Sequence, residues 1–303
     1  MKNKTIYALG FFDGVHIGHA ALLETCRELA KEGNCHSGVV TFSAHPDTLV
    51  LGNTPRLINT PEDREKLLRG FGMDTVVTLP FDRQMRDRPW RDFLELLRRD
   101  YGAAGFVCGA DFRFGAQGAG NAGMLAVYCR AEELPWAVVP EQTLDGIRIS
   151  STYIRERIES GDMATAVKFL GHPHILSGEV IHGRHLGSTL GIPTANLHLP
   201  QSLAVPRFGV YMCRCMVDGI TYPAVTNVGT RPTVNGQNVT VEPWILDYEG
   251  DLYGREIVLE FHRFLRPERK FPDLQALKTE IVRNAQQTRD YFREEPVQTT
   301  FKF

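Results

Sequence analysis

The sequence predicts two domains, a doubly wound α/β domain with a parallel sheet and an all-β barrel that ends in a helix. The length of 303 residues favours two domains. Up to about Gly171, short β-branched runs alternate with amphipathic helical stretches, which is typical of a parallel sheet covered by helices. After Gly171 the hydrophobic period becomes two, which is typical of half-buried strands. We therefore expect domains at residues 1–172 and 173–303, with a short boundary around His172 to Ser177.

The first half is expected to begin in the order βαβαβ. A helix is predicted over Ala20 to Lys31, between the first two strands, with Gly33 placed to end it. Thr60 as a capping residue and Pro61 at the first helical position predict the start of another helix. Doubly wound sheets bind ligands at the carboxyl ends of their strands, so a site is expected there. The expected strands are Ile6 to Leu9, Val39 to Phe42, Thr75 to Leu79, Phe106 to Cys108 and Ala137 to Val139.

The second half is expected to form a small closed barrel, because closure removes exposed strand edges. Asp218 and Gly219 predict a hairpin turn between two of its strands. A helix is predicted over Asp273 to Phe292, with Leu274, Leu277, Ile281 and Ala285 on one stripe that packs on the barrel. The expected strands include Tyr211 to Val217, Ile220 to Val225, Val239 to Leu246 and Glu256 to Phe264.

Composition makes several classes of function poor candidates. The net charge is −2 and neither half has a basic excess, which speaks against binding to nucleic acid or to an anionic membrane. The sequence shows no export signal or membrane-spanning stretch. The cysteines are scattered without a CxxC pair, which predicts reduced thiols in a cytoplasmic protein. They are Cys26, Cys35, Cys108, Cys129, Cys213 and Cys215.

A glycine-rich turn follows the first expected strand and leads directly into the first helix. Glycines in such a turn let a phosphate approach backbone N–H groups, and the helix N-terminus adds partial positive charge. His16 and His19 project into the same place and can donate hydrogen bonds to a triphosphate. The alternative is a tight turn with two histidines by chance, but both histidines at this junction favour a phosphate site. The candidate binding residues are Gly10, Phe11, Asp13, Gly14 and Gly18, and the catalytic candidates are His16 and His19.

Another candidate phosphate site lies where a later helix begins, at residues 149–155. Ser151 and Thr152 at a helix start are usually capping residues. Arg155, on the first turn beside backbone donors, favours a clamp for phosphate oxygens instead.

These motifs resemble those of the HxGH nucleotidylyltransferases and, more narrowly, the adenylyltransferase half of the prokaryotic bifunctional riboflavin kinase/FAD synthetase family. The resemblance rests on Gly10 to His19, on His45 with Pro46, on Gly109 to Gly115 and on Ile149 to Arg155. It implies that a substrate phosphate attacks the α-phosphorus of ATP and that pyrophosphate leaves.

The resemblance also implies roles for individual residues. His16 and His19 would bind the ATP phosphates, whereas Ser151, Thr152 and Arg155 would bind the leaving pyrophosphate. Asp111 would contact the nucleotide or the flavin, with a simple turn acceptor as the alternative. Phe112 and Phe114 fit either core packing or a wall that faces the isoalloxazine ring.

A second glycine-rich stretch lies early in the second half and ends in Pro193, Thr194, Ala195 and Asn196. It is not a Walker loop, because no GK[ST] follows. Its glycines would let backbone amides line a path for ATP phosphates, and the Thr194 hydroxyl and Asn196 carbonyl are hard ligands suited to Mg²⁺. The alternative is turn geometry alone. The candidate nucleotide-binding residues are Gly183, Gly187, Gly191 and Asn196, and the metal candidates are Thr194 and Asn196.

The remainder of the second half resembles the riboflavin kinase module of the same family. The resemblance rests on Asn227 to Thr233, on Val241 with Glu242, and on Asp247 to Gly254. It implies a six-stranded barrel, and it makes Glu242 the general base that accepts the proton of the riboflavin 5′-hydroxyl. An exposed strand charge is the alternative for Glu242. The positions that depart from the family pattern are Ser43, Ala44, Ser188, Pro243 and Trp244.

The resemblance predicts a cytoplasmic, bifunctional enzyme of flavin-cofactor synthesis. The barrel would phosphorylate riboflavin to FMN and the α/β domain would convert FMN to FAD, each with ATP as co-substrate and Mg²⁺. The expected partners are riboflavin, FMN and ATP, without nucleic acid or membrane, and the expected state is a monomer or weak homo-oligomer. Two alternatives stay open: a nucleotidylyltransferase for another phosphate with the barrel as an accessory, and a flavin- and nucleotide-binding regulator without catalysis.

Overall fold

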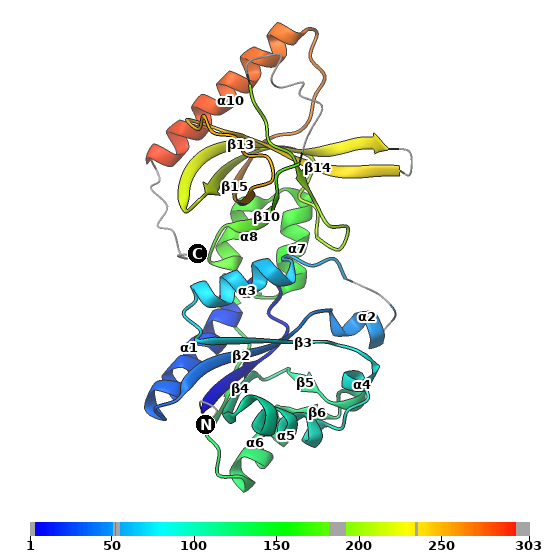
Figure 1. The fold of residues 1–303 in the computed structure, drawn as a ribbon, viewed down its shortest axis with the longest axis vertical. Coiled ribbons are helices and arrows are strands. Elements are labelled where there is room, and N and C mark those ends of the chain that lie inside the picture. Colours follow the sequence, from blue (N-terminus) through cyan, green and yellow to red (C-terminus); the bar gives the residue numbers. More distant parts are fainter. Residues whose placement is uncertain (1–3, 51, 53–54, 182–191, 234–235, 295–303) are drawn as a thin grey trace. The chain divides into compact units, whose positions relative to one another are not determined.

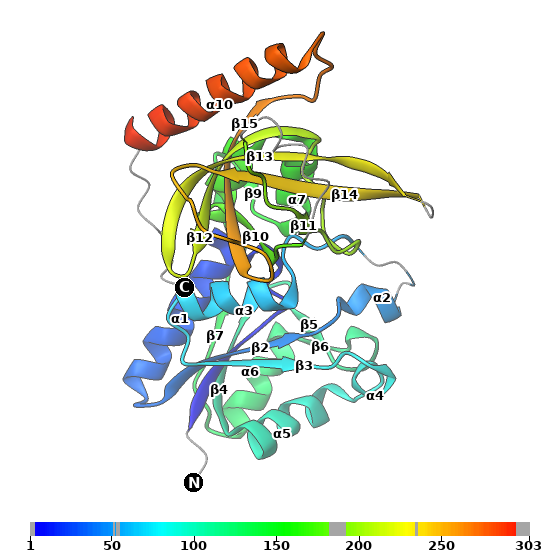
Figure 2. The same ribbon diagram turned by 45° about the horizontal axis from the view of Figure 1, so that its top comes forward.

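The computed structural model forms two compact units, Met1–Ser151 and Thr152–Thr300, and each is described by itself. The described residues are 4–50, 52, 55–181, 192–233 and 236–294 (Figures 1 and 2). The units are groups of contacting residues and do not test where functional domains divide. The limits 1–172 and 173–303 therefore stay a prediction.

The first unit is built on a five-stranded parallel sheet in the order β3-β2-β1-β4-β7. The strands are β1 (Thr5–Leu9), β2 (His36–Phe42), β3 (Thr75–Leu79), β4 (Ala103–Gly109) and β7 (Trp136–Val139). Each of the five strands expected from the sequence is present, so the doubly wound α/β prediction is confirmed. The first strand lies at the centre, which places the glycine-rich turn at the middle of the carboxyl edge.

Helices cover both faces of this sheet (Figure 1). The helix α1 (Ile17–Glu32) packs against β1, β2, β4 and β7. The helix α3 (Pro61–Gly70) begins at the expected cap, because the Thr60 hydroxyl accepts from the Asp63 N–H at 3.0 Å and Pro61 is the first helical residue. On the other face, α5 (Trp90–Tyr101) and α6 (Ala122–Ala131) share a core with alternate residues of β1, Tyr7 and Leu9.

Short elements occupy the connections of the first unit. The helical ones are η1 (Asp13–Val15), α2 (Pro46–Val50), α4 (Arg83–Arg86) and η2 (Ala116–Gly118). The strand pairs are β5 (Arg113–Phe114) with β6 (Gly120–Asn121), and β8 (Thr143–Leu144) with β9 (Ile147–Arg148).

The second unit contains a six-stranded antiparallel sheet in the order β10-β15-β12-β13-β14-β11. A bridge between Val180 and Leu197 joins its two edges, so the sheet is nearly closed into the expected barrel. The strand β14 does not pair with the following β15, which instead lies between β10 and β12. The strands are β10 (His174–Glu179), β11 (Leu197–His198), β12 (Gly209–Val217), β13 (Ile220–Thr233), β14 (Gly236–Ile245) and β15 (Glu256–Arg266).

Helices flank the barrel at both ends of its sequence. The helix α7 (Ser151–Ser160) leads into α8 (Met163–Leu170), which packs against β10 and β15. The terminal helix α10 (Leu274–Glu294) packs against β13 as predicted, but the first residue of its expected stripe, Leu274, is 66% exposed. Ala285 of that stripe contacts a buried cluster with Val210 and Val225.

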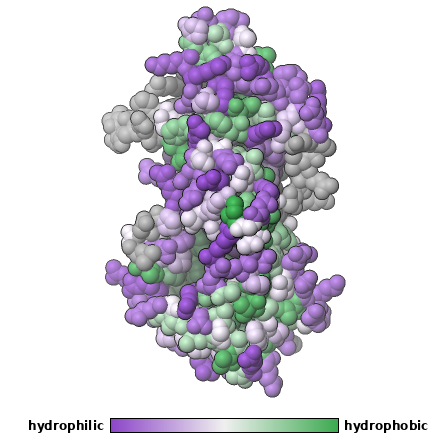
Figure 3. All heavy atoms as spheres, turned by 180° about the vertical axis from the view of Figure 1, so that it is seen from behind, coloured by the Kyte–Doolittle hydropathy of each residue, from purple (hydrophilic) through white to green (hydrophobic). Residues whose placement is uncertain are grey.

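Apolar side chains on the surface are spread over different elements. Val127, Ile220 and Leu274 are among the exposed ones, and the face in Figure 3 is mostly hydrophilic with small separate apolar groups. Along the described part of the chain, no helix is both long and apolar enough to cross a membrane.

One buried histidine of the second unit lacks polar partners. His174, the first residue of β10, is fully buried with its ring 5.8 Å from the ring of Phe261. Neither of its ring nitrogens has a hydrogen-bond partner among the described residues. Burial, together with His172, lowers the pKa of His174 to about 3. An unsatisfied buried polar group costs about 1–3 kcal/mol, so this position carries a penalty that an apolar ring would remove.

We expect His174→Phe to raise the free energy of unfolding and to reduce the acid sensitivity of the second unit. The folded pKa is depressed below 6.5, so the unfolded chain binds the proton first and stability falls from about pH 6.5 down to about pH 3. Between pH 6.5 and pH 5 the wild type should lose about 2 kcal/mol that the variant keeps. Urea unfolding at both pH values measures this difference, and equal losses in the two proteins would contradict it.

Candidate functional site

The turn after β1 has an unusual backbone at the carboxyl edge of the first sheet. Phe12, Gly14 and Val15 all have positive φ, at 60°, 81° and 41°. Positive φ is easy for glycine but costs a β-branched residue such as valine of the order of 1–3 kcal/mol. A strained backbone persists only where contacts from the surrounding structure hold it in place, and such residues cluster at ligand sites.

Three side chains hold this turn in place. The buried Asp13 carboxylate accepts from the backbone N–H groups of Ile58 at 2.8 Å and Asn59 at 3.4 Å. The Thr41 hydroxyl donates to the Phe11 carbonyl at 2.8 Å, and the Ser151 hydroxyl donates to the Asp13 carbonyl at 2.9 Å. The turn is therefore fixed by contacts to segments far away in the sequence.

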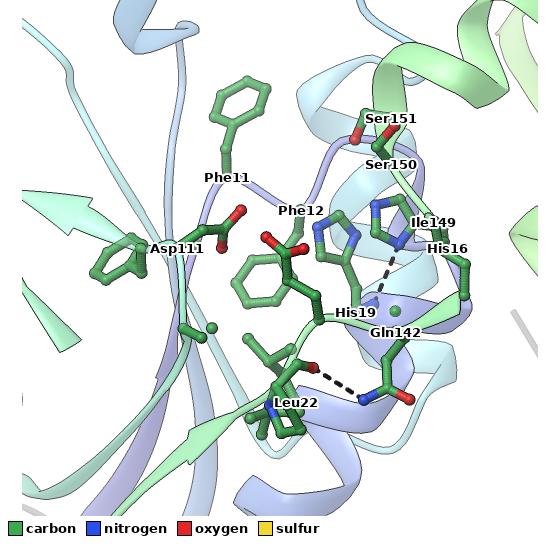
Figure 4. Close-up of a pocket in the computed structure, with 18 of the residues that line it drawn as sticks. Phe11, Phe12, His16, His19, Leu22, Asp111, Gln142, Ile149, Ser150 and Ser151 are labelled. Carbon is green, nitrogen blue, oxygen red and sulfur yellow. Dashed lines mark hydrogen bonds between the residues drawn. The ribbon is translucent and has the colours of Figure 1, made fainter. Parts of the chain in front are cut away.

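The two histidines form a stacked pair at the start of α1. His16 is the N-cap residue, and its Nδ1 accepts from the backbone N–H of His19 at 3.2 Å. The two rings lie 3.6 Å apart between centroids and are nearly parallel, at 11° (Figure 4). Burial, His16 and Arg64 lower the pKa of His19 well below its ordinary value. His19 is therefore neutral at physiological pH, and its Nδ1 has no partner among the described residues.

The histidine pair lines a cavity of about 280 Å³. The imidazoles lie on one side of it and Asp111 on the other (Figure 4). Arg148, on β9, also lines the cavity and makes ion pairs with Asp111 at 2.8 Å and Glu141 at 2.7 Å. This cavity, the nucleotide cavity below, offers the start of α1, two imidazoles and the Arg148 guanidinium, which suit a polyanion that displaces the carboxylates of Asp111 and Glu141 from Arg148.

A second cavity of the first unit, of about 540 Å³, is lined by aromatic rings. Phe42 contacts Phe81 with ring centroids 5.1 Å apart, and Phe93 and Phe114 also line this aromatic cavity. Phe114 stacks on Phe112, which lines the nucleotide cavity, with centroids 5.5 Å apart. The stacked pair thus places one ring in the wall of each cavity.

The barrel contains a cavity of about 700 Å³ lined by strands and by α10. Glu242 on β14 faces Asn227 on β13 across the sheet register, and both line this cavity. The apolar part of the wall includes Val225, Trp244 and Leu277.

A smaller barrel cavity, of about 110 Å³, shares Thr194 with the larger one. Its other lining residues come mainly from the loop before β15, including Tyr248, Gly250 and Asp251. Thr194 therefore lies where a ligand-sized cavity of the barrel and a smaller one meet.

Comparisons with known proteins match both units. A riboflavin kinase model matches residues 170–292 and an FAD synthetase model matches residues 1–153. Proteins named bifunctional riboflavin kinase/FMN adenylyltransferase from Listeria monocytogenes and Pseudomonas fluorescens are 32% and 35% identical to this chain. These matches cover 95% and 91% of this chain and 92% and 89% of the relatives. The chain belongs to the family of bifunctional riboflavin kinases/FMN adenylyltransferases.

A solved structure shares this family fold over nearly the full length. It is described as a macrolide-efflux protein from Streptococcus pneumoniae, and it matches with a TM-score of 0.84 and 29% identity. The match covers 95% of both chains.

The nucleotide cavity brings together many of the residues expected from the sequence. Gly10, Phe11, His16, Gly18, His19, Asp111 and Ser151 all line it. Asp13 and Gly14 are buried outside its lining, where Asp13 binds backbone amides. Thr152 and Arg155 lie on α7 in the second unit, and their roles stay predictions.

In the barrel, Glu242 and Thr194 line the large cavity together. Asn196 is buried at 7% exposure outside the lining of both barrel cavities, and its backbone carbonyl accepts from the Ile181 N–H at 2.9 Å. Gly183, Gly187, Gly191 and Ser188 lie outside the described residues.

Sequence reasoning missed Arg148 and Glu141 in the nucleotide cavity. Arg148 directly precedes Ile149, so a basic residue at the edge of a recognised motif was the available signal. Glu141 follows β7 at the carboxyl edge of the sheet, where ligand groups are expected.

We expect Gly18→Ala to disturb the histidine pair without weakening the fold. A Cβ at Gly18 would lie 3.2 Å from both Cε1 and Nδ1 of His16, so that ring must shift by a few tenths of an ångström. Alanine also favours the helix by about 1 kcal/mol relative to glycine. The pKa of His19 should rise towards its ordinary value, because His16 contributes to lowering it.

Imidazole NMR titration and urea unfolding of the Gly18→Ala protein measure the two effects. The free energy of unfolding should stay equal or rise by up to about 1 kcal/mol. An unchanged His19 titration would show that the stacked geometry does not depend on the clearance at Gly18.

Proposed function

We propose that this chain makes FMN and then FAD, with each unit carrying one reaction. The barrel transfers the γ-phosphoryl group of ATP to riboflavin, and the α/β unit transfers AMP from ATP to FMN with release of pyrophosphate. The observation that carries this proposal is that each unit has a cavity, of about 540 and 700 Å³, in which apolar side chains lie beside polar ones. These volumes lie in the usual range for ligands of flavin size.

In the α/β unit, the nucleotide cavity would hold the phosphates of ATP. A phosphate oxygen of FMN attacks the α-phosphorus, and the bond from that phosphorus to the bridging oxygen breaks as pyrophosphate leaves. His16 and the neutral His19 would donate hydrogen bonds to oxygens on which charge increases during the transfer. Arg148 would exchange its carboxylate partners for phosphate oxygens.

The aromatic cavity of the same unit supports a place for the isoalloxazine ring of FMN. Aromatic walls stack on a flat ring system, and Arg86 and Arg113 in the same lining offer polar contacts. The Phe112–Phe114 stack between this cavity and the nucleotide cavity would keep the two substrates adjacent.

In the barrel, Glu242 would act as the general base. The riboflavin 5′-oxygen attacks the γ-phosphorus, its proton passes to Glu242, and the bond to the bridging oxygen breaks as ADP leaves. Glu242 and Thr194 line the cavity that would hold riboflavin, and Thr194 also lines the smaller cavity on the ATP side. The reacting atoms would therefore meet beside Thr194.

Magnesium fits the donor chemistry of the barrel site. The Thr194 hydroxyl is a hard oxygen donor in the cavity that Glu242 also lines, and ATP phosphates would complete the set. Asn196 stays a candidate ligand from the sequence. When bound, Mg²⁺ would neutralise the charge that develops on the transferred phosphoryl group.

The surroundings of the protein are part of the proposal. All six cysteines are unpaired thiols, which supports a reducing compartment such as the cytoplasm. We keep the expectation of a monomer or weak homo-oligomer that acts on riboflavin, FMN and ATP, without nucleic acid or membrane.

We expect Glu242→Gln to abolish FMN formation from riboflavin while FAD formation from supplied FMN continues. The amide cannot accept the hydroxyl proton, and loss of a general base costs about 100-fold to 10,000-fold in rate. Chromatography of riboflavin, FMN and FAD measures both reactions in one sample. Loss of both reactions in a folded protein would contradict the assignment of two separate sites.

We expect His19→Ala to give the converse result, with FMN accumulating and little FAD. Removing one preorganised donor to the transferring group lowers the rate about 100-fold or more. The same chromatographic assay applies, with the riboflavin kinase rate as the internal control. Normal FAD output from this variant would exclude His19 from the mechanism.

A further inference from the structure

Arg64, in the first turn of α3, is a buried cation that the proposed mechanism does not use. Its side chain is 1% exposed, and its Nη2 donates to the Phe42 carbonyl at 2.5 Å. Its Nε and Nη1 are buried without a hydrogen-bond partner among the described residues. Burying a guanidinium with two unpartnered nitrogens costs several kcal/mol. Packing alone does not account for this residue, because an apolar side chain would fill the same space without that cost.

The guanidinium connects the walls of the two cavities in the α/β unit. Its central carbon lies 4.2 Å from the ring centroid of Phe11, which lines the nucleotide cavity. Its Nη2 donates to the backbone carbonyl of Phe42, and Phe42 lines the aromatic cavity. The Phe11 ring is also contacted edge-on by His45, with centroids 4.6 Å apart. The position of the Phe11 ring is therefore fixed by the guanidinium of Arg64 and by the imidazole of His45.

The charge of Arg64 acts on the residues of the turn. Burial lowers its pKa to about 10, opposed by the nearby carboxylates of Asp13 and Glu62, so it stays protonated at neutral pH. Its positive charge contributes, after burial and His16, to keeping His19 neutral. Arg64 lies behind the lining of the nucleotide cavity, whose own charged residues are Asp111, Glu141 and Arg148.

We propose that Arg64 is a positioning residue for adenylyl transfer, which fixes Phe11 against the end of β2 and adds a buried positive charge beside the phosphate site. The stack of Arg64 on Phe11 and its hydrogen bond to Phe42 fix the distance between a wall of the nucleotide cavity and a wall of the aromatic cavity. The charge attracts polyphosphate through an interior of low dielectric constant, where it is weakly screened. This inference rests on the proposed adenylyltransferase function.

The test compares Arg64→Met, which removes the charge at similar volume, with Arg64→Lys, which keeps the charge but loses the flat stack. For Arg64→Met, kcat/KM for FAD formation from FMN should fall about tenfold or more, and the His19 pKa should rise. Arg64→Lys should restore the His19 pKa and only part of the rate, because an ammonium does not reproduce the planar contact. The riboflavin kinase rate and the thermal midpoint report whether each protein is folded.

A double-mutant cycle of Arg64→Lys with Phe11→Leu keeps the proposal testable if Arg64→Met does not fold. Coupled effects on kcat/KM are expected, because both changes remove the same contact. Additive effects would overturn the stacking role. Unchanged kinetics and an unchanged His19 titration in folded Arg64→Met would overturn the proposal as a whole.

The outcomes also separate this inference from the proposed function. If the wild type forms no FAD from FMN and ATP, the proposed function fails. His19 titration in the protein without ligands still measures the electrostatic effect of Arg64 in that case, and an unchanged value in Arg64→Met would overturn the electrostatic role independently.

Discussion

The buried carboxylate of Asp13 is the contact on which the nucleotide site depends. It binds two backbone amides just before α3 and so holds a turn with two non-glycine residues at positive φ. That turn delivers His16 to the N-cap of α1, where it can both cap the helix and stack on His19. The segment with the two bound amides, Ile58 and Asn59, leads into α3, where Arg64 packs against the ring of Phe11. Asp13 therefore links the strained turn and the start of α1 to the segment before α3, together with the contacts from Thr41 and Ser151.

The two units solve a similar problem with different folds. Each must place a flat apolar ring next to a charged phosphate chain, and each has an apolar cavity in contact with polar groups. Under the proposed function, the parallel sheet would do this at the carboxyl ends of its strands, where turns and helix starts gather. The barrel would do it between the face of β13 and β14 and the terminal helix, where Thr194 and Glu242 line one cavity.

The sequence predicted the strands and the histidine pair well, because both depend on local patterns. The β-branched runs mark the strands, and the order of glycines and histidines marks the turn after β1. The role of Asp13 could not be predicted, because its partners lie 45 and 46 residues away. In the sequence, Arg64 is one of several charged residues on a polar helix, and nothing in that pattern indicates that the tertiary structure buries it.

A chromatographic time course of the wild-type protein with riboflavin, ATP and Mg²⁺ tests the central claim most directly. The account predicts that FMN appears first and that FAD follows at its expense. FMN without any FAD would contradict the assignment of the nucleotide and aromatic cavities to adenylyl transfer. Bound flavin with no product at all would contradict both reactions.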